Sequence, residues 1–288
     1  MSRPRCCFLT MDDMAHYVSD DELAISPLND VGWDFTTLSW SDPQATWDAF
    51  EIVVIRTTWD YQKRPQEFLE VLARIDASSA RLENSIDIVK WNLDKRYLRD
   101  VEERGSPIVP TIWDATYDQR SFYRWMADLG TDELIIKPTI SATAEHTYRL
   151  QEFDDELTAV FAERAFMVQP FLQSVIDEGE FSLFYFNGEY SHTILKAPKP
   201  ADFRVQEEHG GIITAVEPTD ELLAAGQIAF DLIGSAPLYA RVDLVRDAGG
   251  SLVVMELELI EPALYLRMDE GSPARFAAAI DRRMRGTK

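Results

Sequence analysis

The sequence predicts a mixed α/β protein in which an open α/β layer precedes a part built from antiparallel hairpins. Residues 52–55 are four β-branched apolar residues in a row, which is typical of a strand covered on both faces. Asn187-Gly188 and residues 247–250 carry turn chemistry between alternating runs, and each predicts a hairpin. The chain has 288 residues, enough for a large core or for two to three subdomains.

The composition excludes several classes of protein. Apolar residues make up 46% of the chain, so it is globular rather than disordered. A net charge of −22 argues against nucleic acid as a partner, but it allows a small anionic ligand held by a few local cations. No membrane span or signal peptide is expected. Cys6 and Cys7 are neighbours on one predicted strand and point to opposite faces, so no disulfide is expected and a reducing cytoplasm is predicted.

The first eighty residues alternate strands and helices. Strands are predicted at residues 6–10, 33–38 and 52–55, and a capping box from Ser19 to Glu22 predicts a helix between the first two strands. Pro65 opens a further helix, because proline suits the first helical turn. Strand, helix, strand and helix in this order form an open α/β layer.

The loop after the third strand is a candidate substrate site. Residues 56–61, RTTWDY, directly follow the buried strand, and ligands of open parallel sheets bind at the carboxyl ends of strands. The alternative is an ordinary loop whose two aromatic rings pack inward. The candidate substrate residues are Arg56, Thr57, Thr58, Asp60 and Tyr61.

The middle of the chain places one lysine of interest in a predicted helix and another in a predicted strand. A helix over residues 89–104 contains Lys95, and the apolar strand 133–137 ends in Lys137, which either lies at the surface or reaches for a phosphate. The loop 139–147 is rich in hydroxyl groups but lacks glycine, so it is a weak phosphate-binding signal by itself. Helices are expected at residues 121–129 and 154–163, and a strand at residues 166–168.

The last third is dominated by hairpins and two helices. Strands 181–186 and 189–195 flank Asn187-Gly188, and a long polar loop containing Arg204 follows them. A helix over residues 219–233 precedes the second hairpin. The final helix starts with Ser272 as its N-cap and proline next to it.

The second hairpin, residues 239–262, places charged groups on one face. If Arg246 pairs with Ser251, then Arg241 lies opposite Glu256, and the two-residue period groups Arg241 with three carboxylates. Met255 then falls on the apolar face. Crowded carboxylates favour a hard divalent ion such as Mg²⁺, although a solvated edge hairpin explains the same pattern. The candidate metal ligands are Asp243, Glu256 and Glu258.

The order of these parts resembles the ATP-grasp superfamily, in the branch of prokaryotic glutathione synthetase and the RimK-type ligases. The resemblance rests on Lys95 in WNLDK, Lys137 in IKP, the QPF run, Gly179-Glu180, Arg204 and the acidic hairpin. It covers residues 84–266, and the segments RTTWDY and MELELIEP look most like the subgroup that includes the cycloserine-forming enzyme. It implies an ATP-grasp fold with an N-terminal α/β domain at 1–88, a lid subdomain at 89–170 and a C-terminal antiparallel-sheet subdomain at 171–288.

The resemblance also implies roles for particular residues. Catalysis would involve Arg204 and Arg241. Glu258 would be a full metal ligand, a bridge between two ions, or a partner of Arg241 beside the metal. The metal would be Mg²⁺, as one or two ions, with Mn²⁺ as a substitute. The residues that would bind ATP are Lys95, Lys137, Ser141, Thr147, Gln169, Phe171, Leu172 and Glu180.

The implied activity is an ADP-forming ligation. ATP phosphorylates a small, amino-acid-like carboxylate, and an amine or related nucleophile displaces the phosphate. A homodimer is a further expectation. The alternatives are a metal-dependent hydrolase, which would not need Lys95 and Lys137, and a nucleotide-binding scaffold without turnover.

Overall fold

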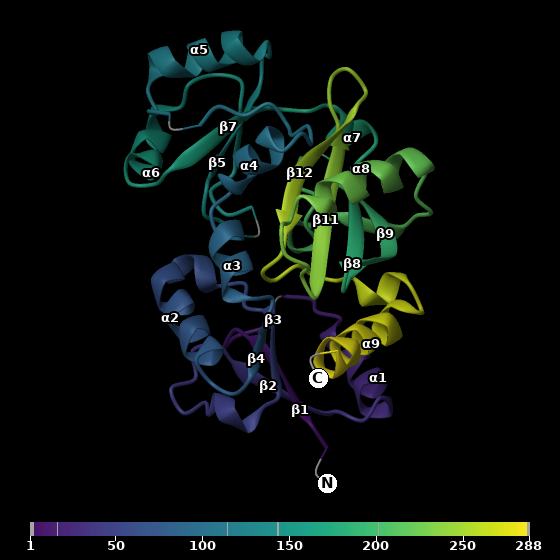
Figure 1. Ribbon diagram of the computed structural model, residues 1–288. Coiled ribbons are helices and arrows are strands. Elements are labelled where there is room, and N and C mark those ends of the chain that lie inside the picture. Colours follow the sequence, from purple (N-terminus) through teal and green to yellow (C-terminus); the bar gives the residue numbers. More distant parts are fainter. Residues whose placement is uncertain (1–2, 16, 114, 143, 201, 287–288) are drawn as a thin grey trace.

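Three separate sheets make up the protein (Figure 1). The structure is a computed structural model that describes residues 3–15, 17–113, 115–142, 144–200 and 202–286. A parallel sheet lies at the N-terminal end, a small antiparallel sheet lies at the opposite end, and a five-stranded antiparallel sheet stands beside both. Within the described residues, no helix combines the length and the apolar composition needed to cross a membrane.

The N-terminal sheet confirms the predicted open α/β layer. Its four strands are parallel in the order β2-β1-β3-β4, and all six residues of β3 are buried. The strands are β1 (Arg5–Thr10), β2 (Asp34–Ser39), β3 (Ile52–Thr57) and β4 (Arg81–Glu83), and the layer's helices are α1 (Ile25–Asp30) and α2 (Pro65–Asp76).

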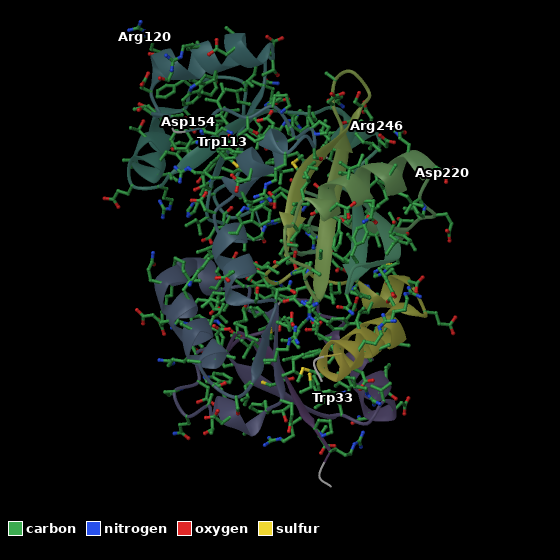
Figure 2. The ribbon with its side chains drawn as sticks, in the orientation of Figure 1. Trp33, Trp113, Arg120, Asp154, Asp220 and Arg246 are labelled. Atoms are coloured by element: carbon green, nitrogen blue, oxygen red, sulfur yellow. The ribbon has the colours of Figure 1, made fainter. Side chains whose placement is uncertain are left out.

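Each face of this sheet has its own core. Cys7 and Ile55 pack with Phe68 of α2, whereas Cys6 and Phe8 pack with Phe276 of α9 (Ser272–Arg285). The C-terminal helix therefore covers the N-terminal sheet. Figure 2 shows Trp33 beside this helix, and the Trp33 indole donates to Asp281 at 3.1 Å.

The small sheet carries a compact aromatic core. Its order is β6-β5-β7, with Lys137 on the central strand, and the rings of Tyr117, Trp125 and Phe166 pack beneath it. The strands are β5 (Leu134–Pro138), β6 (Tyr148–Leu150) and β7 (Phe166–Pro170), and the helices are α5 (Gln119–Leu129) and α6 (Thr158–Ala162).

The five-stranded sheet contains both predicted hairpins in the order β10-β9-β8-β11-β12. Its strands are β8 (Glu180–Phe186), β9 (Glu189–Ala197), β10 (Ile212–Ala215), β11 (Tyr239–Arg246) and β12 (Leu252–Glu258). Its helices are α7 (Ser174–Asp177) and α8 (Asp220–Asp231). The chain passes from one sheet to the next near the predicted domain boundaries. The boundaries themselves stay a prediction, because α9 shares one core with the N-terminal sheet and with β8.

The helix predicted over residues 89–104 is wrong. The chain forms α3 (Ile86–Asn92) and α4 (Tyr97–Glu103) with a link between them. Tertiary hydrogen bonds break the helix: Asn92 binds the backbone of β12, and the amide of Lys95 donates to Thr139 O at 2.7 Å. The break places Lys95 in the link rather than on a helix face.

Two predicted helix caps also differ. The Ser19 hydroxyl accepts from the amide of Asp21 at 3.2 Å, and a 3₁₀ turn (Asp21–Ala24) precedes α1. Ser272 lies inside α9 after Gly271, and its hydroxyl donates to Leu266 O at 2.9 Å. In both cases the serine hydroxyl hydrogen bonds to a nearby backbone group instead of capping the predicted helix.

His192 on β9 makes folding sensitive to acid. Its ring stacks on Phe184 at 4.2 Å, and Nε2 donates to Leu264 O at 3.0 Å. Burial lowers the pKa of His192 from 6.5 to about 4. Between these values the unfolded chain binds more protons than the folded protein, so the free energy of unfolding falls as the pH falls.

As the pH falls from 6.5 to 4, protonation of His192 in the unfolded chain should lower the free energy of unfolding by up to about 3 kcal/mol. One pKa unit corresponds to about 1.4 kcal/mol. Urea unfolding at several pH values should show a shallower acid dependence for His192→Gln than for the wild type. Parallel pH profiles for the two proteins would contradict the expectation.

Candidate active site

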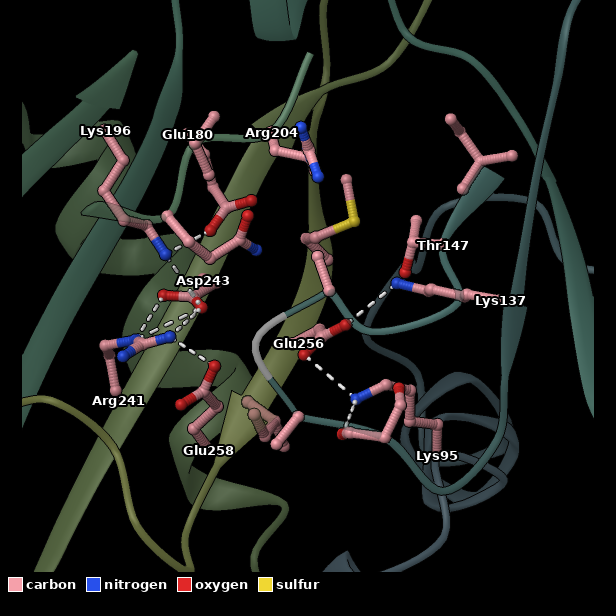
Figure 3. A pocket seen from close by; sticks show the side chains of 18 of the residues that line it. Lys95, Lys137, Thr147, Glu180, Lys196, Arg204, Arg241, Asp243, Glu256 and Glu258 are labelled. Carbon is pink, nitrogen blue, oxygen red and sulfur yellow. Dashed lines mark hydrogen bonds and ion pairs between the residues drawn. The ribbon is translucent and has the colours of Figure 1, made fainter. Parts of the chain in front are cut away.

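A cavity of about 200 Å³ lies where the three sheets meet. The N-terminal part contributes Trp59 and Tyr61, the small sheet contributes Lys137 and Gln169, and the large sheet contributes most of the remaining wall. The protein is acidic overall, yet the basic groups of the wall are numerous (Figure 3): Lys95, Lys137, Lys196, Arg204 and Arg241. Among the described residues, the same wall also carries six carboxylates, so an anionic ligand finds its partners at these basic groups rather than in a uniformly positive cavity.

The β11–β12 hairpin supplies the acidic part of the wall through a bulge. The predicted register is wrong, because Asp243 pairs with Glu256 and Arg241 pairs with Glu258. Leu244 then pairs with Val254, so Met255 is an extra residue that lines the cavity instead of the apolar face. The turn pairs Arg246 with Leu252 rather than Ser251, and the bulge adds a second shift of one residue. The two shifts together move each partner by two positions, so the charged residues still face the cavity (Figure 3).

Glu256 is held between two lysines from different elements. Its carboxylate accepts from Lys137 Nζ at 2.8 Å and from Lys95 Nζ at 3.3 Å, and Lys95 also donates to Ser141 O at 3.3 Å (Figure 3). Burial raises the pKa of Glu256, but Lys137 and Lys95 outweigh burial and hold it well below the usual range. Both ammonium groups are thus fixed at the cavity wall.

A second charged cluster surrounds Asp243. The Asp243 carboxylate accepts from Ser182 at 2.5 Å, from Arg241 at 2.9 Å and from Lys196 at 3.2 Å. Arg241 also pairs with Glu258, and Lys196 also pairs with Glu180. Burial and Arg241 lower the pKa of Lys196, yet Asp243 and Glu180 outweigh them and raise it, so this ammonium group stays charged.

The carboxylates differ in their fitness for a metal ion. Among the described residues, no three His, Cys, Asp or Glu side chains are placed together to hold a metal. Both oxygens of Asp243 are taken by neighbours, and the side chain is almost fully buried. Glu256 and Glu258 are partly exposed to the cavity, and their oxygens, which now bind Lys and Arg, are the donor type that Mg²⁺ prefers. These two residues fit Mg²⁺ best.

Most of the predicted substrate loop does not reach the cavity. Arg56 is 1% exposed and binds Asp21 at 3.0 Å, Thr57 donates to Thr10 at 2.8 Å, and Asp60 accepts from the Trp40 indole at 2.7 Å. Thr58 is fully buried. Among the five predicted substrate residues only Tyr61 lines the cavity, so inward packing accounts for the rest of the loop.

The other predicted positions line the cavity, and their ligand roles stay predictions. They are Ser141, Thr147, Gln169, Phe171, Leu172, Glu180 and Arg204. Arg204 forms two hydrogen bonds to Asp202, at 3.1 and 3.0 Å, and Arg149 stacks on the Phe171 ring at 3.7 Å. Thr143, within the predicted phosphate loop, lies outside the described residues.

Sequence reasoning missed three charged residues of the wall, Lys196, Glu208 and Glu261. Lys196 pairs in register with Glu180 across the hairpin at Asn187-Gly188. Counting strand positions outward from that turn pairs Glu180 with Leu195 instead, because a bulge at Ser191 shifts the register by one residue. The sequence therefore carried no direct signal for this pair. Glu261 follows β12 without a periodic pattern that marks it.

Known proteins resemble this chain over most of its length. Residues 6–84 match a family described as the N-terminal domain of D-cycloserine synthetase DcsG. The cycloserine biosynthesis protein DcsG of Streptomyces lavendulae is 32% identical over 277 residues, which cover 88% of this chain and 90% of that protein.

Solved structures agree with this similarity. The crystal structure of D-cycloserine synthetase DcsG superimposes with a TM-score of 0.81 at 28% identity, covering 97% of this chain and 99% of that one. The ATP-grasp ligase PsnB, solved with a minimal precursor, Mg and ADP, has a TM-score of 0.66 at 15% identity, covering 97% and 98%. The similarity to PsnB is one of fold alone.

The similarity to DcsG extends over 88% of this chain in sequence and 97% in structure. It confirms the predicted fold class and the resemblance to the cycloserine-forming subgroup. The chain therefore belongs to the DcsG family of ATP-grasp ligases and is an ATP-dependent, ADP-forming ligase.

Proposed function

We propose that the enzyme transfers the γ-phosphoryl group of ATP to the carboxylate of a small amino-acid derivative, giving an acyl phosphate and ADP. An amine or related nucleophile then attacks the acyl carbon and expels phosphate. The observation that carries this proposal is the convergence of Lys95 and Lys137 on Glu256 at one cavity wall. An anionic polyphosphate can replace the carboxylate as the partner of both ammonium groups.

The wall offers a consistent place for each part of the nucleotide. Gln169, Phe171 and Leu172 form the edge that would meet adenine, and Glu180 would lie near the ribose. The loop with Ser141 and Thr147 would cover the phosphates and exclude water, which protects an acyl phosphate from hydrolysis.

The transferred group would lie near the two arginines. Arg204 and Arg241 would stabilise its charge, since phosphoryl transfer depends mainly on positioning and electrostatics. When bound at Glu256 and Glu258, with Asp243 behind them, Mg²⁺ would neutralise charge on the phosphate oxygens.

The substrate class draws support from the relatives. DcsG is named for cycloserine, a small amino-acid-derived product, and it shares 32% of its residues with this chain. The proposal therefore includes an amino-acid-derived carboxylic acid and leaves open an amide, a peptide or a ring as product. ADP release screened over amino acids and derivatives, with Mg²⁺ present, tests it directly.

Lys137→Ala is expected to weaken ATP binding at least about 100-fold, because it removes a phosphate contact and leaves Glu256 with less positive charge nearby. Fluorescent-nucleotide titration measures this. Lys90→Ala, which removes an exposed lysine of α3, should bind ATP like the wild type.

Equal ATP affinity in Lys137→Ala and the wild type would refute the phosphate role. Metal-dependent hydrolysis that persists in Lys137→Ala would instead indicate a hydrolase, and ATP binding without ADP release from any acid would indicate a scaffold.

A cytoplasmic location is supported by two buried, unpaired cysteines, Cys6 and Cys7. Titrating ADP release with Mg²⁺ and Mn²⁺ would count the ions and test the substitution. Light scattering would test the expected homodimer.

A further inference from the structure

Glu261 differs from the other carboxylates that line the cavity. Glu180, Asp243, Glu256 and Glu258 each lie within 4 Å of a lysine or arginine nitrogen. Within the part of the chain that the structure describes, no such ion pair is found for Glu261. Glu208 also lines the cavity without such a pair, but it is exposed to solvent, whereas Glu261 is only partly exposed. Glu261 is therefore the half-buried carboxylate whose charge the described side chains of the cavity do not directly balance.

Buried side chains fix the main chain at Glu261 through hydrogen bonds. The Trp59 indole donates to Glu261 O at 2.8 Å, Arg56 donates to Pro262 O at 2.9 Å, and the Tyr239 hydroxyl donates to Ile260 O at 2.7 Å. Three consecutive carbonyl groups are held in this way. Arg56 and Trp59, from the predicted substrate loop, thus build the floor under Glu261.

The side chain of Glu261 faces the cavity. It lines the cavity wall together with Tyr61. Burial, and then the charge of Glu258, raise the pKa of Glu261 to about 8, although Lys95 opposes the shift. An unpaired negative charge is costly here, and a bound cation would remove that cost.

We propose that Glu261 binds the protonated amino group of the substrate, and that Tyr61 orients the carboxylate for this contact. The ligand class is an amino acid or close derivative with a cationic nitrogen, and its carboxylate would be the group that ATP phosphorylates. This assignment rests on the proposed function, and it makes Glu261 the residue that selects an amine-bearing acid over the same acid without the amine.

The opposing charges of the cavity support this division. The basic groups Lys95, Lys137 and Arg204 suit phosphates and a carboxylate, while Glu261 with Tyr61 is the matching partner for an ammonium group. An amino acid carries both charges. A ligand with only a carboxylate would leave Glu261 unpaired and would bind less well.

Equilibrium binding tests the assignment without requiring turnover. Calorimetric titration of the full chain with ADP and Mg²⁺ present would compare D- and L-alanine with propionate, and D- and L-serine with 3-hydroxypropionate. We expect the wild type to prefer an amine-bearing acid by about 10- to 100-fold, as for a charge-assisted hydrogen bond in a buried site. Glu261→Gln should lose this preference and keep its affinity for ADP.

Two controls separate recognition from folding. Glu70→Gln, which neutralises an exposed carboxylate on α2, should keep the wild-type preference. Glu261→Asp, which retains the charge, should recover part of the preference that Glu261→Gln loses. Thermal unfolding of each variant shows whether the protein remains folded. If Glu261→Gln does not fold, the preference measured for Glu261→Asp tests the assignment.

The outcomes are distinct. The assignment is overturned if the wild type binds both members of every pair equally, or if Glu261→Gln keeps the preference. ADP release with the same acids tests the proposed function separately: a preference for amines in binding, with no ADP released from any acid, would uphold Glu261 and refute the ligase assignment at this site.

Discussion

Glu256→Gln is expected to lower ADP release at least about 1,000-fold, the largest effect on activity in the protein. A neutral amide cannot balance the ammonium groups of Lys137 and Lys95, which lie 2.8 and 3.3 Å from the carboxylate. It is also a poorer ligand for Mg²⁺ than a carboxylate. Both losses act on the phosphate end of the cavity, so steady-state ADP release measured with an active acid should reveal them together.

The same variant separates catalysis from stability. Removing one partner from a buried ion pair often costs about 3 to 5 kcal/mol, so urea unfolding has to be measured alongside the rate. Glu189→Gln is the matched control, because Glu189 pairs with Arg282 at an exposed site and should retain nearly full activity. A folded Glu256→Gln enzyme with more than a tenth of the wild-type rate would show that this carboxylate does not organise the phosphate site.

Asn84→Ala should lower the free energy of unfolding by about 3 to 5 kcal/mol, the largest single effect on stability that we expect from a hydrogen-bonding side chain. The Asn84 amide donates to Tyr239 O at 2.9 Å and to Leu259 O at 2.7 Å, and its oxygen accepts from the amide of Leu238 at 2.6 Å. The residue is fully buried at the end of β4. Alanine would leave three backbone groups of the β11–β12 region without partners.

Urea denaturation followed by circular dichroism measures this loss. Gln173→Ala, which removes one exposed hydrogen bond to Asp177, should change stability by no more than about 0.5 kcal/mol. A loss below about 1 kcal/mol in Asn84→Ala would mean that water replaces the amide, and that Asn84 does not join the N-terminal sheet to the hairpin.

Local patterns were sufficient to predict most of the strands and part of the site. The apolar run in β3, the turn at Asn187-Gly188 and the alternation in β11 predict strands because side-chain period and turn chemistry act within a few residues. Lys137 and Glu256 are identified in the same way. Their positions at the end of a buried strand and on a charged strand face do not depend on distant contacts.

Contacts between distant segments decided the rest. Asn92 and the amide of Lys95 break a predicted helix because β12 and Thr139 offer better hydrogen bonds than the next helical turn. The bulge at Met255 shifts the hairpin register, which no count from the turn reveals. Arg56 looks like a ligand group in sequence, yet the fold uses it to hold Pro262 O.

The sequence by itself determined the fold class, the order of the parts and the charged residues available for phosphate chemistry, because these follow from periodicity and residue type. Only the tertiary structure decided which charges meet: Lys95 and Lys137 on Glu256, Arg241 on Glu258, and none of the described basic groups on Glu261. Electrostatic partners are set by distances of a few ångströms between segments far apart in the chain, and those distances exist only after the three sheets have packed.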